Sequence, residues 1–316
     1  MRHLLSSSLA LALLSLGCAA PESGDAAGAG PGTPEAEDGD GEWAAELAAH
    51  REEIHGKFVS YGPSPIAGTQ RLSAEPPASR PAYLTREDRT FAFADAPGPA
   101  AALSLAKEGS GWTWEKRGDD VSCTAGEEPA ESGSTVSGDV SFDVSGIHLG
   151  CHLGADEITC IVYDPERPEK KAFEHLVYYP PDRSYAVPAR LVRIAEPDEV
   201  EMLTSLGRKS TFVRYARIHF QLEGQEQTLT AYKSTYAGEW SDSLFVPFRD
   251  TTSGQETYGA GRYIDLVEPE GEALILDFNR AYNPLCNYSP AFNCPIPPRE
   301  NRLAVAIRAG EKTYPH

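Results

Sequence analysis

After residue 70 the chain consists of short segments separated by turns, and apolar and polar residues alternate at period two in several of them, such as residues 138–143 and 273–279. Short runs of β-branched and aromatic residues lie between turns rich in Gly, Ser and Glu, which predicts antiparallel strands rather than helices. In the first half the predicted strands are residues 90–94, 101–106, 111–116, 140–144 and 158–163. The pattern therefore predicts a mainly β protein of antiparallel sheets, arranged as a sandwich or a barrel-like fold.

The second half carries two predicted hairpins. Between residues 211 and 235, alternate positions from Ala216 to Leu222 form one apolar face, and a Glu-Gly-Gln-Glu turn leads into the returning strand. Residues 263–267 and 273–279 flank a Glu-Pro-Glu-Gly-Glu turn, which predicts the second hairpin.

One segment near the N-terminus has helical rather than strand spacing. Apolar residues recur there at one and two helical turns, at Trp43, Leu47, Ile54 and Phe58, while charged residues occupy the other faces. This spacing predicts an amphipathic N-terminal helix over residues 42–57 that packs against the folded body.

The residues before this helix have the features of a targeting segment and a spacer. Residues 1–17 are typical of a secretory signal, and their apolar stretch is too short to span a membrane. This stretch ends in Ser-Leu-Gly-Cys, which resembles a bacterial lipobox and predicts lipidation of Cys18; ordinary cleavage near Ala19 and Ala20 is the alternative. Residues 18–41 are rich in Ala, Gly, Pro and acidic residues and predict a disordered acidic tether.

These patterns divide the chain into four segments. The signal peptide (1–17) and the tether (18–41) precede a helix and β-rich region at 42–165 and a C-terminal β-rich region at 166–316. The formal net charge of −19 argues against a nucleic-acid partner and against charge-driven binding to anionic lipid. We therefore expect a protein of the cell envelope, held at a membrane by the lipid on Cys18.

The six cysteines allow more than one arrangement. Disulfides form outside the cytoplasm, and Cys286 and Cys294 flank a short proline-containing loop, which predicts a disulfide between them. Cys151 and Cys160 are the next candidates. If Cys18 carries lipid, five cysteines remain, so at least one free thiol is expected.

The densest group of polar, aromatic and rigid residues lies in the last quarter of the chain. The motifs there are F-R-D-T-T-S-G-Q-E-T-Y-G-A-G-R-Y at 248–263, D-F-N-R-A-Y-N-P-L-C at 277–286 and C-P-I-P-P-R-E-N-R-L-A-V-A-I-R-A-G-E at 294–311. Together with L-G-R at 206–208, they resemble a bacterial and archaeal family known only as a domain of unknown function. The resemblance is strong over the second half and weak over the first, and it departs from the family at Leu285, where a second proline is usual. It implies one coherent domain in the second half and no particular activity.

Strand ends and loops of this region carry side chains that we expect to line one pocket. Asp277 and Asn279 project from the same side of a predicted strand end, and the prolines that follow stiffen the loop. Asp250 and Asp277 are the candidates for acid/base catalysis. The candidates for ligand binding are Arg249, Tyr258, Arg262, Tyr263, Asn279, Tyr282 and Asn283. Acidic, amide and tyrosine groups in this combination suit a carbohydrate or another polar small molecule.

Three interpretations of this set stay open. The function we predict is binding of a polar small ligand or an envelope component. The alternatives are a hydrolase that uses the Asp250 and Asp277 region, and a structural network in which Arg249 and Arg262 are buried partners of the two aspartates. The sequence contains no P-loop, no nucleophile motif and no zinc-protease motif. No cofactor or metal site is predicted, because the alternating His148 and His152 are a weak signal without further ligands.

Overall fold

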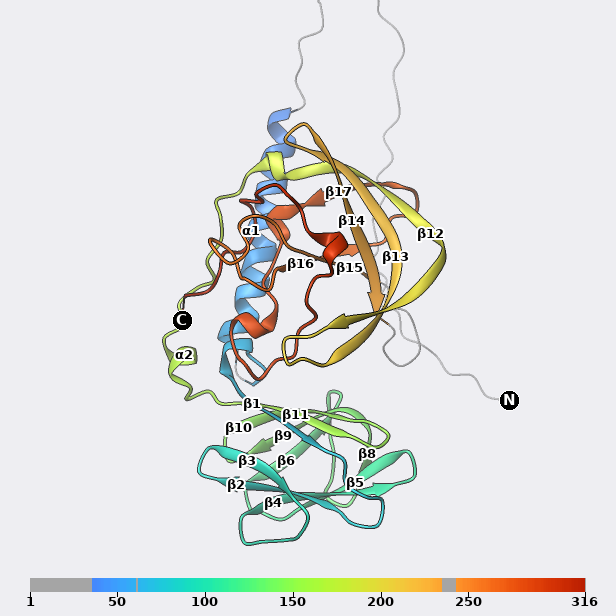
Figure 1. Cartoon of the computed structure of the whole chain (residues 1–316). Coiled ribbons are helices and arrows are strands. Elements are labelled where there is room, and N and C mark those ends of the chain that lie inside the picture. Colours follow the sequence, from blue (N-terminus) through green and yellow to red (C-terminus); the bar gives the residue numbers. More distant parts are fainter. Residues whose placement is uncertain (1–35, 61, 235–242, 316) are drawn as a thin grey trace, which may run out of the picture.

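A computed structural model describes residues 36–60, 62–234 and 243–315. The predicted signal peptide, the lipidation site Cys18 and most of the predicted tether lie outside the described residues. The described part consists of two β regions, one above the other, with a long helix beside the C-terminal one (Figure 1). The prediction of a mainly β protein with antiparallel sheets and one N-terminal helix is confirmed.

The N-terminal β region is a sandwich of two antiparallel sheets. One sheet has the strand order β1-β11-β10-β9-β6-β7, and the other has the order β3-β2-β4-β5-β8. Their bounds are β1 Gly68–Ala74, β2 Ala82–Glu87, β3 Thr90–Ala94, β4 Ala101–Glu108, β5 Gly111–Lys116, β6 Val121–Ala125, β7 Glu128–Pro129, β8 Thr135–Val136, β9 Gly138–Val144, β10 Ile147–Leu153 and β11 Ile158–Tyr163. Trp112 and Leu103 from one sheet pack with Phe142, Leu149 and Val162 from the other. Alternate residues of β9, β10 and β11 are buried, so the period-two pattern reports one core face and one outer face.

The C-terminal β region is a single six-stranded sheet bent into a half-barrel. Its order is β16-β15-β14-β13-β12-β17. The strands are β12 Ala186–Leu203, β13 Lys209–Leu222, β14 Gln225–Ser234, β15 Ser243–Phe248, β16 Arg262–Val267 and β17 Ala273–Asp277. The predicted hairpin is confirmed as β13 and β14, joined by Glu223 and Gly224 with φ of 53° and 73°. Positive φ at both positions matches the twist of the flanking strands.

The second predicted hairpin is wrong. β16 and β17 follow each other in the sequence, but they are the two opposite edges of the sheet: β16 pairs with β15, and β17 pairs with β12. The reason lies in the connecting loop, because Arg193 of β12 donates hydrogen bonds to the carbonyls of Pro269 and Gly271 at 2.6 and 3.3 Å. These bonds hold the loop beside β12. The strand that follows the loop, β17, therefore pairs with β12 and not with β16.

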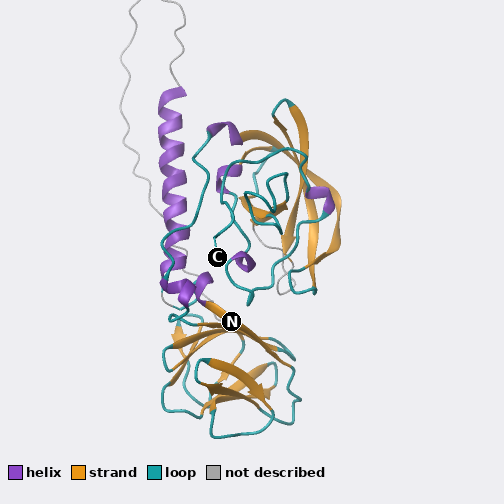
Figure 2. Ribbon diagram, turned by 60° about the vertical axis from the view of Figure 1, so that its left-hand side comes forward, coloured by secondary structure: helices purple, strands orange, loops and turns teal. Residues whose placement is uncertain are grey.

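Helix α1 (Ala36–Val59) packs along the C-terminal half-barrel, and its end reaches the sandwich (Figure 2). The helix begins six residues before the predicted start, so residues 36–41 of the segment predicted as tether are helical. The predicted apolar stripe is the buried face, with Leu47 and Phe58 almost completely covered. Phe58 stacks on Phe173 and meets Tyr288 edge-on, with ring centroids 5.4 and 4.7 Å apart.

The other helices of the described residues are short. They are α2 (Pro168–Lys171) and the 3₁₀ turns Pro65–Ala67, Arg183–Tyr185, Phe278–Arg280, Leu285–Asn287 and Arg299–Asn301. Within the described ranges, none of the helices has both the length and the apolar composition that crossing a bilayer requires.

Candidate functional site

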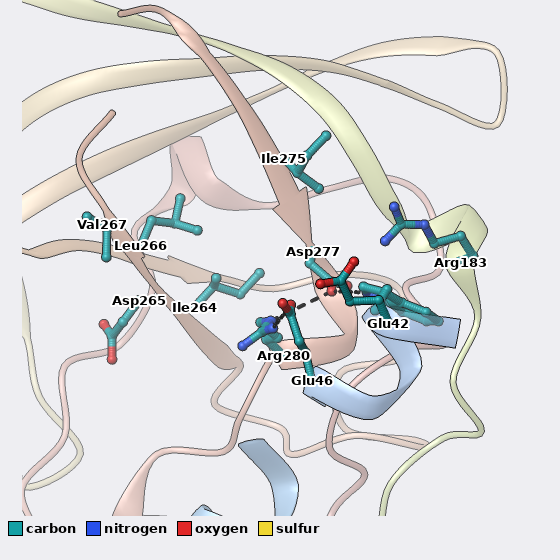
Figure 3. Close-up of a pocket in the computed structure, with 11 residues that line it drawn as sticks. Glu42, Glu46, Arg183, Ile264, Asp265, Leu266, Val267, Ile275, Asp277 and Arg280 are labelled. Atoms are coloured by element: carbon teal, nitrogen blue, oxygen red, sulfur yellow. Dashed lines mark hydrogen bonds and ion pairs between the residues drawn. The ribbon is translucent and has the colours of Figure 1, made fainter. Parts of the chain in front are cut away.

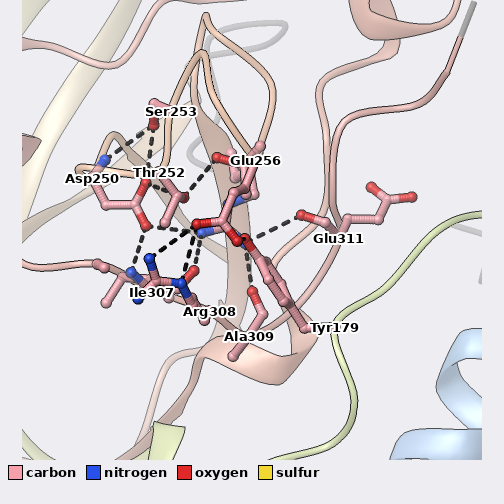
Figure 4. A network of polar contacts seen from close by, with 12 residues as sticks. Tyr179, Asp250, Thr252, Ser253, Glu256, Ile307, Arg308, Ala309 and Glu311 are labelled. Carbon is pink, nitrogen blue, oxygen red and sulfur yellow. Dashed lines mark hydrogen bonds and ion pairs between the residues drawn. The ribbon is translucent and has the colours of Figure 1, made fainter.

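Asp250 and Arg262 form a fully enclosed ion pair in the half-barrel. Figure 4 shows the surroundings of Asp250, with Thr252, Ser253 and Ile307 close to its carboxylate. Arg262 Nη2 lies 3.1 Å from Asp250 Oδ2, and the two side chains are 1% and 0% exposed. The carboxylate also accepts hydrogen bonds from the hydroxyls of Thr252 and Ser253 at 2.8 and 3.0 Å, and from the backbone N–H of Ile307 at 2.7 Å. Both carboxylate oxygens are therefore occupied by protein donors, which leaves Asp250 no face for a substrate.

The arginine of this ion pair provides hydrogen-bond donors to the segment near the end of the chain, which has no neighbouring strand in a sheet. Alternate residues from Leu303 to Ala309 are buried in the core, although the segment belongs to no sheet. Arg262 donates to the carbonyls of Ile307, Ala309 and Glu311 at 2.8, 2.5 and 3.2 Å. Buried carbonyls need such partners, so one guanidinium supplies the bonds that a ladder would otherwise give. The geometry assigns Asp250 and Arg262 a structural role.

Asp277 connects helix α1 to the end of β17 (Figure 3). Its Oδ2 accepts a hydrogen bond from Trp43 Nε1 at 2.8 Å, and its Oδ1 accepts two bonds from Asn279, both at 2.9 Å. Asn279 in turn exchanges hydrogen bonds with the backbone of Asp182. Asp277 thus caps the turn after β17 and holds the helix in place.

The Trp43 cavity, of about 400 Å³, lies between α1 and the two edge strands of the half-barrel. Residues of β16 and β17 form one side, and Glu42, Trp43 and Glu46 of α1 form the other (Figure 3). The Arg183 guanidinium lies 5.1 Å from the centre of the Trp43 ring. Within the lining of this cavity, Asp277 accepts a hydrogen bond from Trp43 and forms an ion pair with Arg280, which also pairs with Glu46.

The Glu311 cavity, of about 420 Å³, adjoins the Trp43 cavity and shares Asp265 and Arg280 with it. Helix α1 covers one side of this cavity, and the loops that follow β17 cover the other. The lining from α1 is His50, Glu53, Ile54, Lys57 and Phe58. The lining from the C-terminal loops is Tyr282, Asn283, Leu285, Tyr288 and Glu311. Charged, hydrogen-bonding and apolar side chains therefore line one cavity, as in small-molecule sites.

A buried polar cluster of Glu311, Tyr288 and Asn283 lies in the wall of this cavity. Glu311 is 1% exposed, and it accepts hydrogen bonds from the Tyr288 hydroxyl at 2.7 Å and from the Asn283 backbone N–H at 2.5 Å. Asn283 Nδ2 donates to the carbonyl of Lys312 at 2.7 Å. Asn283 Oδ1, in contrast, is buried and has no hydrogen-bond partner among the described residues. An unmade hydrogen bond of this kind costs about 1–3 kcal/mol.

The Glu311 carboxyl titrates near neutrality. Burial raises its pKa to about 7, because the charged form loses its hydration. The hydrogen bonds from Tyr288 and Asn283 and the positive charges of Arg262 and Arg51 favour the carboxylate and limit this rise in pKa. A small change in the surroundings of the carboxyl is therefore enough to change its protonation state.

Gly310 brings this carboxyl into the cluster. Its φ is 76°, and a Cβ at this position would lie 2.6 Å from the Ala281 carbonyl oxygen and 2.7 Å from that of Phe278. The Glu311 N–H donates to the same Ala281 carbonyl at 2.8 Å. Only glycine fits this close approach, which explains the Gly-Glu pair at the end of the third motif.

The predicted site residues do not form one pocket. Asp277 lines the Trp43 cavity, and Tyr282 and Asn283 line the Glu311 cavity. Asp250 and Asp277 share neither a hydrogen-bond partner nor a cavity, so the geometry gives no support to joint catalysis. The other predicted residues support the scaffold. Arg262 belongs to the ion pair and Asn279 to the cap, and the backbone of Arg249 bonds to Asn301 and Leu303. The hydroxyls of Tyr263 and Tyr258 donate to the backbone carbonyls of Pro295 and Cys286.

The cysteines pair differently from the first prediction. Cys151 and Cys160 form a disulfide across β10 and β11, with their Cα atoms 4.0 Å apart. Cys286 and Cys294, predicted to be bridged, are free thiols, as is Cys123. The two residues are in contact without an S–S bond, because Cys294 Sγ accepts a hydrogen bond from the Cys286 backbone N–H at 3.2 Å.

Glu311, Tyr288, Arg280 and Asp265 are site residues that the sequence did not single out. Glu311 and Arg280 stand within the quoted motifs, but each is one charged residue among several. The helix residues that cover the cavity are more than 200 positions away in sequence. Among the described residues there is no group of three or more His, Cys, Asp or Glu side chains that could hold a metal ion. His148 and His152 lie next to Asp143 and Asp139 at 3.4 and 2.8 Å.

Residues 171–312 match the model of a family described as "Protein of unknown function (DUF1684)". This part of the chain belongs to the DUF1684 family. A solution NMR structure of an uncharacterized protein of Haloarcula marismortui is similar, with 40% sequence identity, coverage of 48% of this chain and 83% of that chain, and a TM-score of 0.40. None of the curated proteins compared with the chain matches it.

The boundaries of the match divide the site. The DUF1684 residues supply Asp265, Arg280, Asn283 and Glu311, whereas helix α1 and the sandwich lie before the matched range. The Glu311 cavity is therefore completed by a helix that the family match does not include.

Proposed function

We propose that this DUF1684 protein is an extracytoplasmic, lipid-anchored protein that binds a small polar ligand in the Glu311 cavity. The signal-like residues 1–17, the lipobox-like sequence before Cys18 and the acidic spacer after it support this location. The spacer would hold α1 and the cavity at a distance from the membrane surface.

The observation that carries the proposal is the unsatisfied acceptor in the cavity wall. Asn283 and Glu311 both line the cavity, and Asn283 Oδ1 has no hydrogen-bond partner among the described residues. This oxygen has no exposed surface of its own, so a ligand reaches it when side chains of the wall shift. Both groups accept hydrogen bonds, so the ligand that completes the cluster carries donors, either hydroxyl or ammonium groups. Such a ligand removes the cost of the unmade hydrogen bond and gains its energy.

The apolar part of the lining describes the rest of the ligand. Ile54, Phe58, Pro65 and Leu285 present apolar surface. A compact ring or short aliphatic body fits this surface, as in an amino sugar, a sugar or a small amine.

The hydrogen bonds that Asp250 and Asp277 already accept from the protein favour binding over hydrolysis. Asp250 is sealed by its four protein donors, and Asp277 is engaged by Trp43 and Asn279. Asp250 has no exposed surface, and both oxygens of Asp277 already accept protein hydrogen bonds, so the geometry favours a structural use of both carboxylates over activation of water or protonation of a leaving group.

A thermal-shift screen of the full chain against amines, amino sugars, simple sugars and polyols tests this function. The matched variants are Leu285→Trp, which fills the mouth of the cavity, and Leu203→Trp, which places the same bulk on an exposed leucine outside both cavities. We expect at least one compound to raise the Tm of the wild type and of Leu203→Trp but not that of Leu285→Trp. A screen without a stabilising compound, or stabilisation that survives in Leu285→Trp, contradicts the proposal.

A separate measurement tests the location. In bacteria expressing the full chain, we expect an alkyne-labelled fatty acid to be incorporated, and Cys18→Ser to abolish incorporation. Labelling that is equal in both proteins, or missing from the wild type, contradicts anchoring at Cys18.

A further inference from the structure

Cys286 and Cys294 lie in one preorganised loop next to the half-barrel. Cys286 belongs to the 3₁₀ turn Leu285–Asn287, which follows Pro284, and Cys294 precedes Pro295. The Cys286 N–H donates to Cys294 Sγ at 3.2 Å, so the loop already holds the Cys294 sulfur next to Cys286. Ser205 fixes the other end of the loop, because its N–H donates to the Cys294 carbonyl at 2.8 Å and its Oγ accepts from the Cys294 N–H at 3.1 Å.

The two thiols differ in accessibility and in surroundings. Cys294 is 8% exposed, whereas Cys286 is partly exposed. The Tyr258 hydroxyl lies 3.6 Å from Cys286 Sγ and donates to it. Hydrogen bonds from Cys294, Tyr258 and Ser205 lower the pKa of Cys286 to about 6, while the pKa of Cys294 is raised by the same pairing and by burial.

From this arrangement we infer that Cys286 and Cys294 form a redox-active dithiol that exchanges with disulfides, with Cys286 as the attacking thiol and Cys294 as the resolving thiol. An accessible thiolate beside a buried second thiol is the arrangement that such exchange requires. The inference rests on the thiol geometry and is independent of the ligand proposed for the Glu311 cavity.

The exchange is balanced in two steps. Cys286 thiolate attacks one sulfur of a small-molecule or protein disulfide, which forms a mixed disulfide and releases one thiolate. Cys294 then loses its proton and attacks Cys286 Sγ, which forms the Cys286–Cys294 disulfide and releases the second thiolate. The chain is oxidised by two electrons, and the substrate disulfide is reduced to two thiols.

Oxidised glutathione is the probe for the first test, used on the full chain with the thiols then trapped by alkylation and located by peptide mass mapping. We expect the wild type to lose two alkylatable thiols, at Cys286 and Cys294, and to recover both with reduced glutathione. Cys294→Ser should stop at a glutathione adduct on Cys286, and Cys286→Ser should react at neither position. Cys123→Ser, which removes the buried lone thiol, should behave as the wild type.

The pH dependence of alkylation provides a second readout that a structural pair of thiols does not show. We expect Cys286 to reach half its maximal alkylation rate near pH 6. At pH 6.5 it should react about tenfold faster than the same cysteine in the urea-unfolded chain, whose thiol is almost fully protonated. Tyr258→Phe removes one donor to the sulfur and should move this midpoint to higher pH.

Two results overturn the inference. One is a folded chain in which Cys286 resists oxidised glutathione and titrates like an ordinary cysteine. The other is a chain isolated with a Cys286–Cys294 bridge that reduced glutathione does not open, which makes the pair a structural disulfide.

Discussion

Two buried polar clusters of the DUF1684 region resemble each other in composition and differ in how fully they are satisfied. Around Asp250 and Arg262, the carboxylate has four protein donors and no exposed surface. Around Glu311 and Asn283, the carboxyl is equally buried and both of its oxygens accept protein hydrogen bonds. It lies in a cavity wall, however, and the neighbouring Asn283 Oδ1 has no partner among the described residues.

This difference separates a structural cluster from a candidate binding site. Charged residues within a motif point equally to both uses when only the sequence is known. The completeness of the hydrogen bonds distinguishes the two uses. A closed cluster, in which every acceptor is paired, has no acceptor left to bind a ligand, whereas an open cluster has an unpaired acceptor. The following predictions separate the two clusters by their response to substitution.

The largest effect is expected in the closed cluster. Asp250→Ala leaves the Arg262 guanidinium buried without its counter-charge, which should lower the free energy of unfolding by about 3–5 kcal/mol. Urea unfolding of the full chain measures this loss. The control is Asp198→Ala, which breaks a surface pair with Arg214 and should cost less than about 1 kcal/mol. Equal losses in the two variants would show that the buried pair is no more important than the surface pair.

The next effect is a pH dependence that comes from Glu311. Its pKa is raised in the folded chain to about 7, so the folded chain binds the proton more tightly than the unfolded chain does. The stabilisation is therefore complete below the unfolded pKa of about 4.5 and is lost as the pH rises to 7. Between these limits the wild type should lose on the order of 3 kcal/mol relative to Glu311→Gln, which cannot titrate there. Urea unfolding at pH 5, 6, 7 and 8 gives both curves, and parallel curves contradict the raised pKa.

A smaller effect is expected where α1 meets the half-barrel. Trp43→Phe keeps an aromatic side chain, although a smaller one, and removes the indole N–H that donates to Asp277 Oδ2. The loss of this charge-assisted bond at an almost buried carboxylate should cost about 1–2 kcal/mol. Unfolding followed by circular dichroism measures it, and unchanged stability would show that the bond does not anchor the helix.

The smallest stability effect belongs to the open cluster. Leu285 is 39% exposed at the mouth of the Glu311 cavity, so Leu285→Trp adds bulk without displacing core atoms. We expect its free energy of unfolding to stay within about 0.5 kcal/mol of the wild type. A larger loss in the same urea experiment would show that the cavity mouth is part of the packed structure.

The sequence predicted elements well wherever local periodicity decides the structure. Strands such as Gly111–Lys116 and Ile158–Tyr163 have the predicted bounds, because each has one core face and flanking turns. The apolar stripe of α1 was predicted for the same reason. The failed hairpin shows the limit, since the partners of β16 and β17 depend on how the whole sheet bends and on Arg193, which is distant in sequence.

The candidate site was predictable only in part. The motifs indicated the correct region, and Asn283 and Tyr282 do line the Glu311 cavity. Asp250 and Arg262 have the same residue types as a catalytic or binding pair, and only their burial assigns them to the scaffold. Glu311 gave no signal by itself, because its environment is formed by loops and by a helix from the other end of the chain.

Calorimetric titration of a compound from the thermal-shift screen into Asp250→Asn and Leu285→Trp tests the contrast between the clusters most directly. Asp250→Asn keeps the shape of the closed cluster and weakens its ion pair, and Leu285→Trp blocks the open one. We predict that Asp250→Asn is less stable but binds the compound with wild-type affinity, whereas Leu285→Trp is as stable as the wild type and binds at least tenfold more weakly. Weakened binding in folded Asp250→Asn together with normal binding in Leu285→Trp would contradict the assignment of the ligand to the Glu311 cavity.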